Sequence, residues 1–67
     1  MIQITLNGQS ATLPPGLTVL ALLEARGLVG KRLAVERNGE IVPRARHAEV
    51  RLAEGDSIEI VVAVGGG

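Results

Sequence analysis

Apolar and polar residues alternate in two parts of this chain, and the alternation predicts β-strands. Residues 2–6 alternate with a period of two, as a strand with one buried face does. Residues 57–64 repeat the pattern over a longer stretch. The apolar face of this last strand would carry Ile58, Ile60, Val62 and Val64. Because it is the longest and most apolar strand, we expect it to lie centrally in a sheet, beside the first strand.

Two Asn-Gly pairs, Asn7-Gly8 and Asn38-Gly39, predict two β-hairpins. This pair is preferred in tight type I′ turns because both central residues need a positive φ. The first pair would join residues 2–6 to a strand at residues 9–13. The second would join strands at residues 33–37 and 40–42, and Pro43 would end the latter because proline has no N–H to donate to a sheet.

A single helix is predicted at residues 19–26, after a linker rich in proline and glycine. Thr18 is placed to cap its first turn, since its hydroxyl can accept from a free backbone N–H. The buried face of the helix would carry Val19, Leu22 and Leu23. Gly27 lies where a glycine commonly ends a helix.

The segment between the second hairpin and the last strand is less regular. Residues 44–49 are polar, and we expect an irregular loop in which His47 is solvated. Residues 50–52 return briefly to apolar character, and residues 53–56 form a turn. The carboxylates are interpreted as solvated charges or turn formers, namely Glu24, Glu36, Glu54 and Asp56.

The order of these elements predicts an α+β domain of the β-grasp (ubiquitin-like) type. A hairpin, a helix, a second hairpin and a long strand each have one apolar face, and a mixed sheet wrapped over the helix buries them all. We expect residues 1–64 to form this domain and residues 65–67 to form a flexible C-terminal glycine tail. A chain of 67 residues accommodates one such domain.

The composition excludes several classes of chemistry. Seven basic and seven acidic residues are scattered without a run of either sign, which argues against nucleic acid as a partner. The chain has no cysteine and one histidine, so we expect no metal site and no catalytic machinery of an autonomous enzyme. No apolar run is long enough to span a membrane, and the first residues lack the features of a secretory signal. We therefore expect a cytoplasmic protein.

The glycines Gly65, Gly66 and Gly67 follow directly on the last apolar stretch. A tail without side chains passes through a narrow opening easily and takes backbone angles closed to other residues. One interpretation is an arm that offers its terminal carboxylate to the active site of another protein. The alternative is a frayed chain end, which is common in small domains.

Three segments together resemble a known family. They are residues 16–23, residues 38–44 with the sequence Asn-Gly-Glu-Ile-Val-Pro-Arg, and residues 54–60, which lead into the final strand and Gly-Gly. In this order they resemble the ubiquitin-like sulfur carriers, and most closely the ThiS family of thiazole (thiamin) biosynthesis. Carriers for molybdopterin synthesis or tRNA thiolation and ubiquitin-like protein modifiers remain alternatives. Ubiquitin has an arginine where this chain has Gly65.

The resemblance implies a protein cosubstrate rather than an enzyme. An adenylating enzyme of the ThiF type would activate the Gly67 carboxylate with MgATP, and a sulfur donor protein would convert it to a thiocarboxylate. A thiazole synthase of the ThiG type would then receive the sulfur. No cofactor would be bound by the carrier itself. Gly65 and Gly66 would enter the partner's site with Gly67.

We also expect contacts with partners on the body of the domain. Val61 and Ala63 should point away from the helix, where they would form an apolar docking patch or an ordinary sheet surface. Arg44 is a candidate for a further partner contact or a simple surface arginine.

Overall fold

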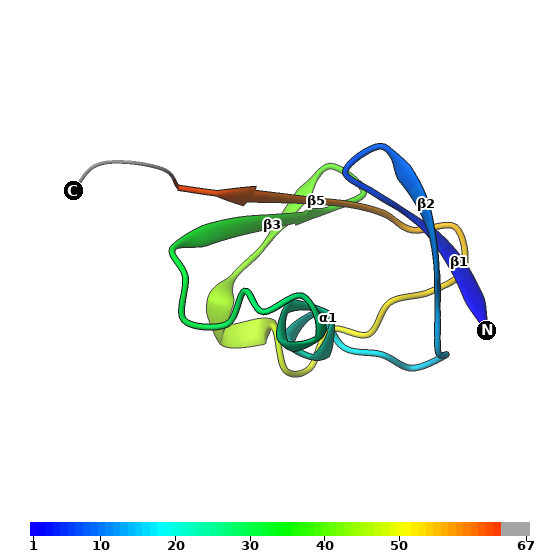
Figure 1. Ribbon diagram of the computed structural model, residues 1–67, viewed down its shortest axis with the longest axis horizontal. Coiled ribbons are helices and arrows are strands. Elements are labelled where there is room, and N and C mark those ends of the chain that lie inside the picture. Colours follow the sequence, from blue (N-terminus) through cyan, green and yellow to red (C-terminus); the bar gives the residue numbers. More distant parts are fainter. Residues whose placement is uncertain (64–67) are drawn as a thin grey trace.

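The computed structural model describes residues 1–63 (Figure 1), so the predictions made for residues 64–67 lie outside the described residues. Within that range the chain forms five strands, one α-helix and one turn of 3₁₀ helix. In chain order these are β1 (Ile2–Leu6), β2 (Gln9–Leu13), α1 (Val19–Ala25), β3 (Leu33–Arg37), β4 (Glu40–Val42), η1 (Arg44–Arg46) and β5 (Ser57–Val62).

The strands form one mixed sheet in the order β2-β1-β5-β3-β4. Strands β1 and β5 run parallel, and the other neighbouring pairs are antiparallel. The helix α1 lies on one side of this sheet, with β3 and β5 passing over it (Figure 1). The predicted central position of β5 beside β1 is confirmed, and the architecture is the predicted β-grasp fold.

Both predicted hairpin turns are present. Asn7 and Gly8 have φ angles of 49° and 80°, and Asn38 and Gly39 have 52° and 86°. A Cβ atom added to either glycine would have no heavy atom within 4 Å. Glycine is therefore required at these positions by the backbone angle and not by lack of space.

The helix begins as predicted and ends one residue earlier than expected. The Thr18 hydroxyl accepts a hydrogen bond from the Ala21 N–H at 3.0 Å, so it caps the first turn. The last helical residue is Ala25, and Arg26 takes the C-cap position. Gly27 follows with a φ of 69°, in the left-handed conformation that ends many helices.

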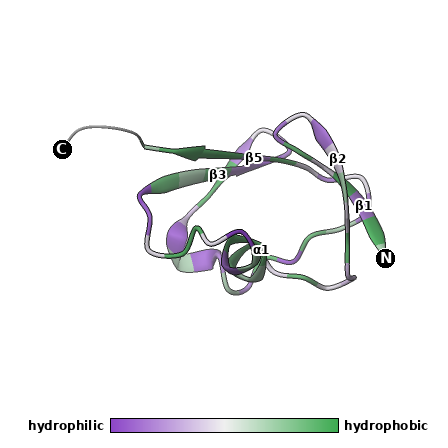
Figure 2. Ribbon diagram, in the orientation of Figure 1, coloured by the Kyte–Doolittle hydropathy of each residue, from purple (hydrophilic) through white to green (hydrophobic). Residues whose placement is uncertain are grey.

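The core lies between α1 and the inner face of the sheet and is built from aliphatic side chains alone. Its fully or nearly buried members are Ile4, Leu6, Val19, Leu22, Leu23, Val35, Val42, Leu52, Ile58 and Ile60. Figure 2 shows the end of β5 as hydrophobic and the segment that leads into β3 as hydrophilic. The buried residues of α1 and of β5 are those of the predicted apolar faces, so these two faces pack against each other in the core.

Two further features differ from prediction. Strand β5 ends at Val62, two residues before the expected end, and Val64 lies outside the described residues. The segment predicted to be irregular contains η1, in which the Arg46 N–H donates to the carbonyl of Pro43 at 2.9 Å.

The prediction that His47 is solvated is wrong, since the residue is only 6% exposed. Its Nε2 lies 3.1 Å from the carbonyl oxygen of Val42, and because a carbonyl only accepts, Nε2 is the donor. The His47 carbonyl in turn accepts from the Leu20 N–H at 2.8 Å. The residue therefore links the end of β4 to α1, a position that the polar sequence around it does not reveal.

Neither described helix is long and apolar enough to cross a membrane.

Candidate functional site

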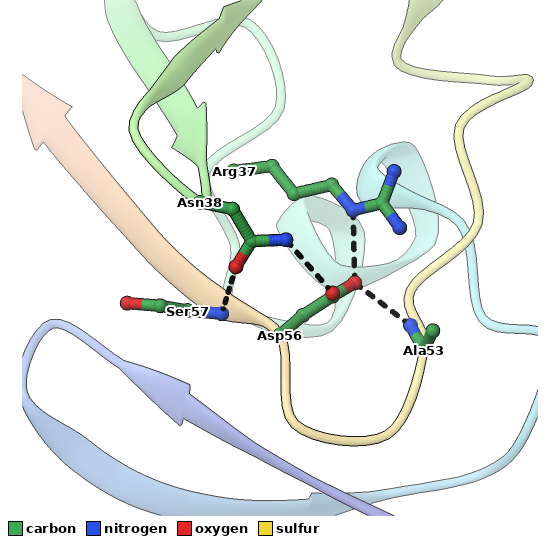
Figure 3. Close-up of polar contacts among 5 residues, drawn as sticks. All are labelled: Arg37, Asn38, Ala53, Asp56 and Ser57. Atoms are coloured by element: carbon green, nitrogen blue, oxygen red, sulfur yellow. Dashed lines mark hydrogen bonds and ion pairs between the residues drawn. The ribbon is translucent and has the colours of Figure 1, made fainter.

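Strand β5 leads toward the predicted glycine tail, and a polar cluster fixes its first residues (Figure 3). The Asp56 carboxylate accepts from Arg37 Nε at 2.9 Å, from Asn38 Nδ2 at 3.0 Å and from the Ala53 N–H at 2.9 Å. The Asn38 side-chain oxygen accepts from the Ser57 N–H at 2.8 Å. The turn between β3 and β4 is thereby bound to the start of β5.

Asp56 is a buried carboxylate, so of its two predicted roles the solvated charge is wrong, and the turn former is confirmed because Asp56 accepts from the Ala53 N–H across the turn. It is 6% exposed. Burial alone would raise its pKa. Three hydrogen bonds, from Ala53, Asn38 and Arg37, together with the positive charge of Arg37 outweigh burial and hold the pKa below its ordinary value of 3.8. The carboxylate is charged at neutral pH, and two of its three partners, Arg37 and Asn38, lie far from it in the sequence.

The middle of β5 is held by Asn7, which sequence analysis assigned only to a turn. The Asn7 side-chain oxygen accepts from the Ile60 N–H at 2.7 Å, and its Nδ2 donates to the Ile60 carbonyl at 3.3 Å. The Asn7 backbone N–H donates to the carbonyl of Ile58 at 2.9 Å. The side chain thus continues the hydrogen bonding between β1 and β5 past the point where the turn leaves the sheet.

The end of β5 is paired with the start of β3. Leu33 lies opposite Val62, and the Ala63 N–H donates to the carbonyl of Arg32 at 2.9 Å. The strand is therefore anchored at its start, middle and end, up to the last residue described. This arrangement fixes the position of the chain up to Ala63.

The predicted partner-contact residues lie around this end of the domain but not on one face. Val61 is 59% exposed on the outer face of the sheet, opposite Ala34. Ala63 is also exposed. Arg44 lies in η1, where its Nη2 donates to the carbonyl of Lys31 at 3.1 Å.

Arg44 and Lys31 border an open groove of about 260 Å³ on the helix side of the domain. Its apolar wall includes Leu20, Leu28 and Val29. The structure therefore places Arg44 on the opposite side from Val61. Segment 31–32 connects Arg44 to Ala63, because it accepts a hydrogen bond from each.

The described part of the chain contains no group of three or more His, Cys, Asp or Glu residues that could hold a metal ion. Gly65, Gly66 and Gly67 lie outside the described residues. What residues 1–63 supply is therefore an anchored base for the tail and two different surfaces beside it.

Comparison with known proteins identifies the family. The model of the ThiS family matches residues 4–67. The chain belongs to the ThiS family. This confirms the resemblance predicted from residues 16–23, 38–44 and 54–60.

Solved and characterised proteins agree with this assignment. The chain is 48% identical over 50 residues to the sulfur carrier protein ThiS of Bacillus subtilis, covering 75% of this chain and 76% of that protein. The crystal structure of the thiamine biosynthesis protein ThiS from Geobacter metallireducens superposes with a TM-score of 0.84 at 30% identity, covering 98% of this chain and 100% of that one.

A second kind of relative is much longer. The chain is 41% identical over 66 residues to a thiazole synthase of Paramagnetospirillum magneticum, and 39% identical over 66 residues to one of Magnetococcus marinus. Each match covers 98% of this chain, which spans about a fifth of the length of these relatives, 20% in both cases.

Proposed function

We propose that this chain is a sulfur carrier whose Gly67 carboxylate is converted to a thiocarboxylate that donates sulfur for thiazole formation in thiamin biosynthesis. The observation that carries the proposal is the family match, because it extends through residues 65–67. The Bacillus subtilis relative named a sulfur carrier protein supports it.

The chemistry requires activation by another protein. A carboxylate is a poor electrophile because its oxygen is a poor leaving group. An adenylating enzyme of the ThiF type would attach AMP from MgATP to the Gly67 carboxylate with loss of pyrophosphate. The persulfide of a sulfur donor protein would displace AMP, and a thiol would cleave the resulting acyl disulfide to leave the thiocarboxylate. The chain itself has no cysteine to compete for the sulfur.

The anchored strand limits where these reactions take place. Four residues follow Ala63. Even fully extended they span at most about 14 Å, whatever their conformation. A partner must therefore bring its reacting atoms within that distance of the end of the sheet, which requires direct contact with the body of the domain.

Two surfaces are available for that contact. The outer sheet face presents Val61 and Ala63, and the helix side presents Arg44 beside the groove. We assign the adenylating enzyme and a thiazole synthase of the ThiG type as the partners. The relatives named thiazole synthase support the second assignment. We place the reactions in the cytoplasm, with no cofactor held by the carrier.

The test is intact-mass spectrometry of the purified chain after incubation with the adenylating enzyme of the same organism, MgATP, a persulfide donor and a thiol reductant. The expected result is a mass increase equal to the difference between one sulfur and one oxygen atom. Omitting ATP, or deleting Gly67, should abolish the increase, and the deletion should leave the circular dichroism spectrum unchanged. The absence of any mass change with active enzyme would refute the proposal.

Two further measurements separate the related functions. The mass of the chain isolated from cells establishes whether Gly67 is its terminal residue, as the proposal requires. Higher-mass adducts joined through an isopeptide bond would instead indicate a protein modifier. Transfer of the sulfur to product by thiazole synthase would distinguish this pathway from molybdopterin synthesis or tRNA thiolation.

A further inference from the structure

The outer face of the sheet is the face that α1 does not cover. Its residues on β1 and β2 differ in character from those on β3, β4 and β5. Strand residues that alternate with the buried ones define this face. On β1 and β2 they are the neutral polar residues Gln3, Thr5, Ser10 and Thr12. On β3, β4 and β5 they include Ala34, Glu36, Ile41, Glu59 and Val61, which we call the acidic sheet patch. No strand position on this face holds Lys or Arg within residues 1–63.

Two carboxylates oppose each other at the centre of the acidic sheet patch. Glu36 and Glu59 are direct partners in the antiparallel register of β3 and β5. Directly opposed residues have Cβ atoms about 4.5–5.5 Å apart, and like charges at such positions destabilise the sheet. The ion pairs found in the described part of the chain are Arg37–Asp56 and Arg46–Glu49, so neither of these glutamates has a basic partner there.

The two carboxylates have exposed apolar neighbours. Ile41 lies opposite Glu36 and is 61% exposed, and Val61 lies opposite Ala34 and is 59% exposed. A contact surface commonly combines apolar side chains with charges that are matched only in the complex. Here a repulsive charge pair and exposed aliphatic groups occupy the same few strand positions.

We propose that the acidic sheet patch is a docking surface for a protein that places an arginine or lysine between Glu36 and Glu59 and apolar side chains over Val61 and Ile41. One cation would turn the repulsion into two attractive contacts, and a guanidinium has enough donors to bind both carboxylates. A neutral or acidic surface would have no electrostatic attraction to these two carboxylates. The partner is thus defined by charge as well as by shape.

Similarity to proteins named thiazole synthase favours thiazole synthase as this partner, an assignment that rests on the proposed function. The patch lies on β5 just before Ala63, so a protein bound to it reaches the base of the tail. Sequence similar to nearly all of this chain occurs in proteins named thiazole synthase. Arg44 and the groove lie on the other side of the domain and stay free in this complex.

The test compares Glu36→Gln, Glu59→Gln and the double variant with the wild-type chain. Binding to the thiazole synthase of the same organism is measured by calorimetry at low and high salt, and thermal unfolding is measured on the free carrier. The control is Glu24→Gln, which removes an exposed carboxylate from α1.

Each patch variant is expected to raise the melting temperature of the free carrier by about 1–4 °C, because either change removes the repulsion. The second change should then add little to the first. Each patch variant should also weaken binding roughly three- to tenfold and reduce its salt dependence. The Glu24→Gln control should bind as the wild type does.

The outcomes separate this inference from the proposed function. Equal affinity of the wild type and all three patch variants, with wild-type binding intact, would overturn the docking site alone. Failure of the wild type to bind thiazole synthase would overturn the assignment of that partner and the docking site with it. Formation of the thiocarboxylate, followed by mass in the same preparations, reports on the carrier function independently.

Discussion

Replacing Asp56 with Asn tests whether the buried carboxylate holds the start of β5. The change keeps the shape of the side chain but gives it an NH₂ group where an acceptor is needed. If the new oxygen faces Arg37 and Ala53, the NH₂ faces Asn38 Nδ2, which is also a donor. Rotating the Asn38 amide would relieve this clash but would break its hydrogen bond from the Ser57 N–H.

The magnitude follows from these contacts. The lost hydrogen bond between Asn38 and a charged acceptor accounts for about 1.5–3 kcal/mol. The bond from Ala53 persists but loses its charge assistance, which costs about 0.5–1 kcal/mol. The Arg37 side chain is 36% exposed, so its ion pair adds only about 0.5 kcal/mol after solvent screening. Neutralising the group recovers part of its desolvation cost, so we expect a net loss of about 2–4 kcal/mol.

This loss is large for a domain of this size. At about 0.05–0.15 kcal/mol per residue, total stability is on the order of 3–10 kcal/mol. The melting temperature should therefore fall by at least about 8 °C. Urea denaturation followed by circular dichroism measures the free energy directly, and Glu24→Gln is the matched exposed control. A loss below about 1 kcal/mol in Asp56→Asn would refute the role assigned to the cluster.

The same cluster predicts a dependence on pH. The folded pKa of Asp56 lies below its ordinary value of 3.8. A lowered pKa contributes stability that is fully present above the unfolded pKa and is lost as the pH falls through the folded pKa. The difference in unfolding free energy between wild type and Asp56→Asn should therefore be constant near neutral pH and narrow in acid below about pH 4. A difference that widens in acid would contradict the assignment.

Substitutions at three other positions test separate features. His47→Ala should cost about 2–3 kcal/mol in urea denaturation, because it removes the buried link from Val42 to α1, and a loss under about 1 kcal/mol would contradict that role. Gly39→Ala should cost about 1 kcal/mol through its positive φ alone, and Gly39→Asn less; equal stability of Ala and Gly would show that the turn relaxes. Val61→Thr, which removes an apolar group without adding charge, should change stability by less than about 0.5 kcal/mol yet weaken binding to thiazole synthase in calorimetry, whereas unchanged binding would remove Val61 from the interface.

The parts of the fold that sequence analysis predicted correctly depend on local signals. The Asn-Gly pairs require positive φ, the alternation in residues 2–6 and from residue 57 onward requires one buried face, and Thr18 precedes a helical apolar stripe. Each of these signals lies within a few residues of the structure it predicts. The central position of β5 was also predicted correctly, because this strand is more apolar than the others.

The features that sequence analysis missed are contacts between distant segments. A polar residue such as Asp56 or His47 has the same local sequence signature whether it is solvated or bound to a buried partner. Asn7 was predicted only as a turn residue, and its bonds to Ile60 depend on the parallel pairing of β1 with β5. The opposition of Glu36 and Glu59 depends in the same way on the register of β3 and β5. The roles of Gly65, Gly66, Gly67, Val61, Ala63 and Arg44 stay predictions.

The central position of β5 also constrains how the domain folds. The two hairpins, β1–β2 and β3–β4, do not touch as neighbours in the sheet, and only the last strand joins them. Thr5 pairs with Ser57, so this joining contact spans most of the chain and must overcome a large loop-closure entropy. During synthesis the edges of β1 and β3 that pair with β5 therefore stay unpaired until β5 emerges. A chain truncated before β5 would leave those edges open to aggregation or proteolysis.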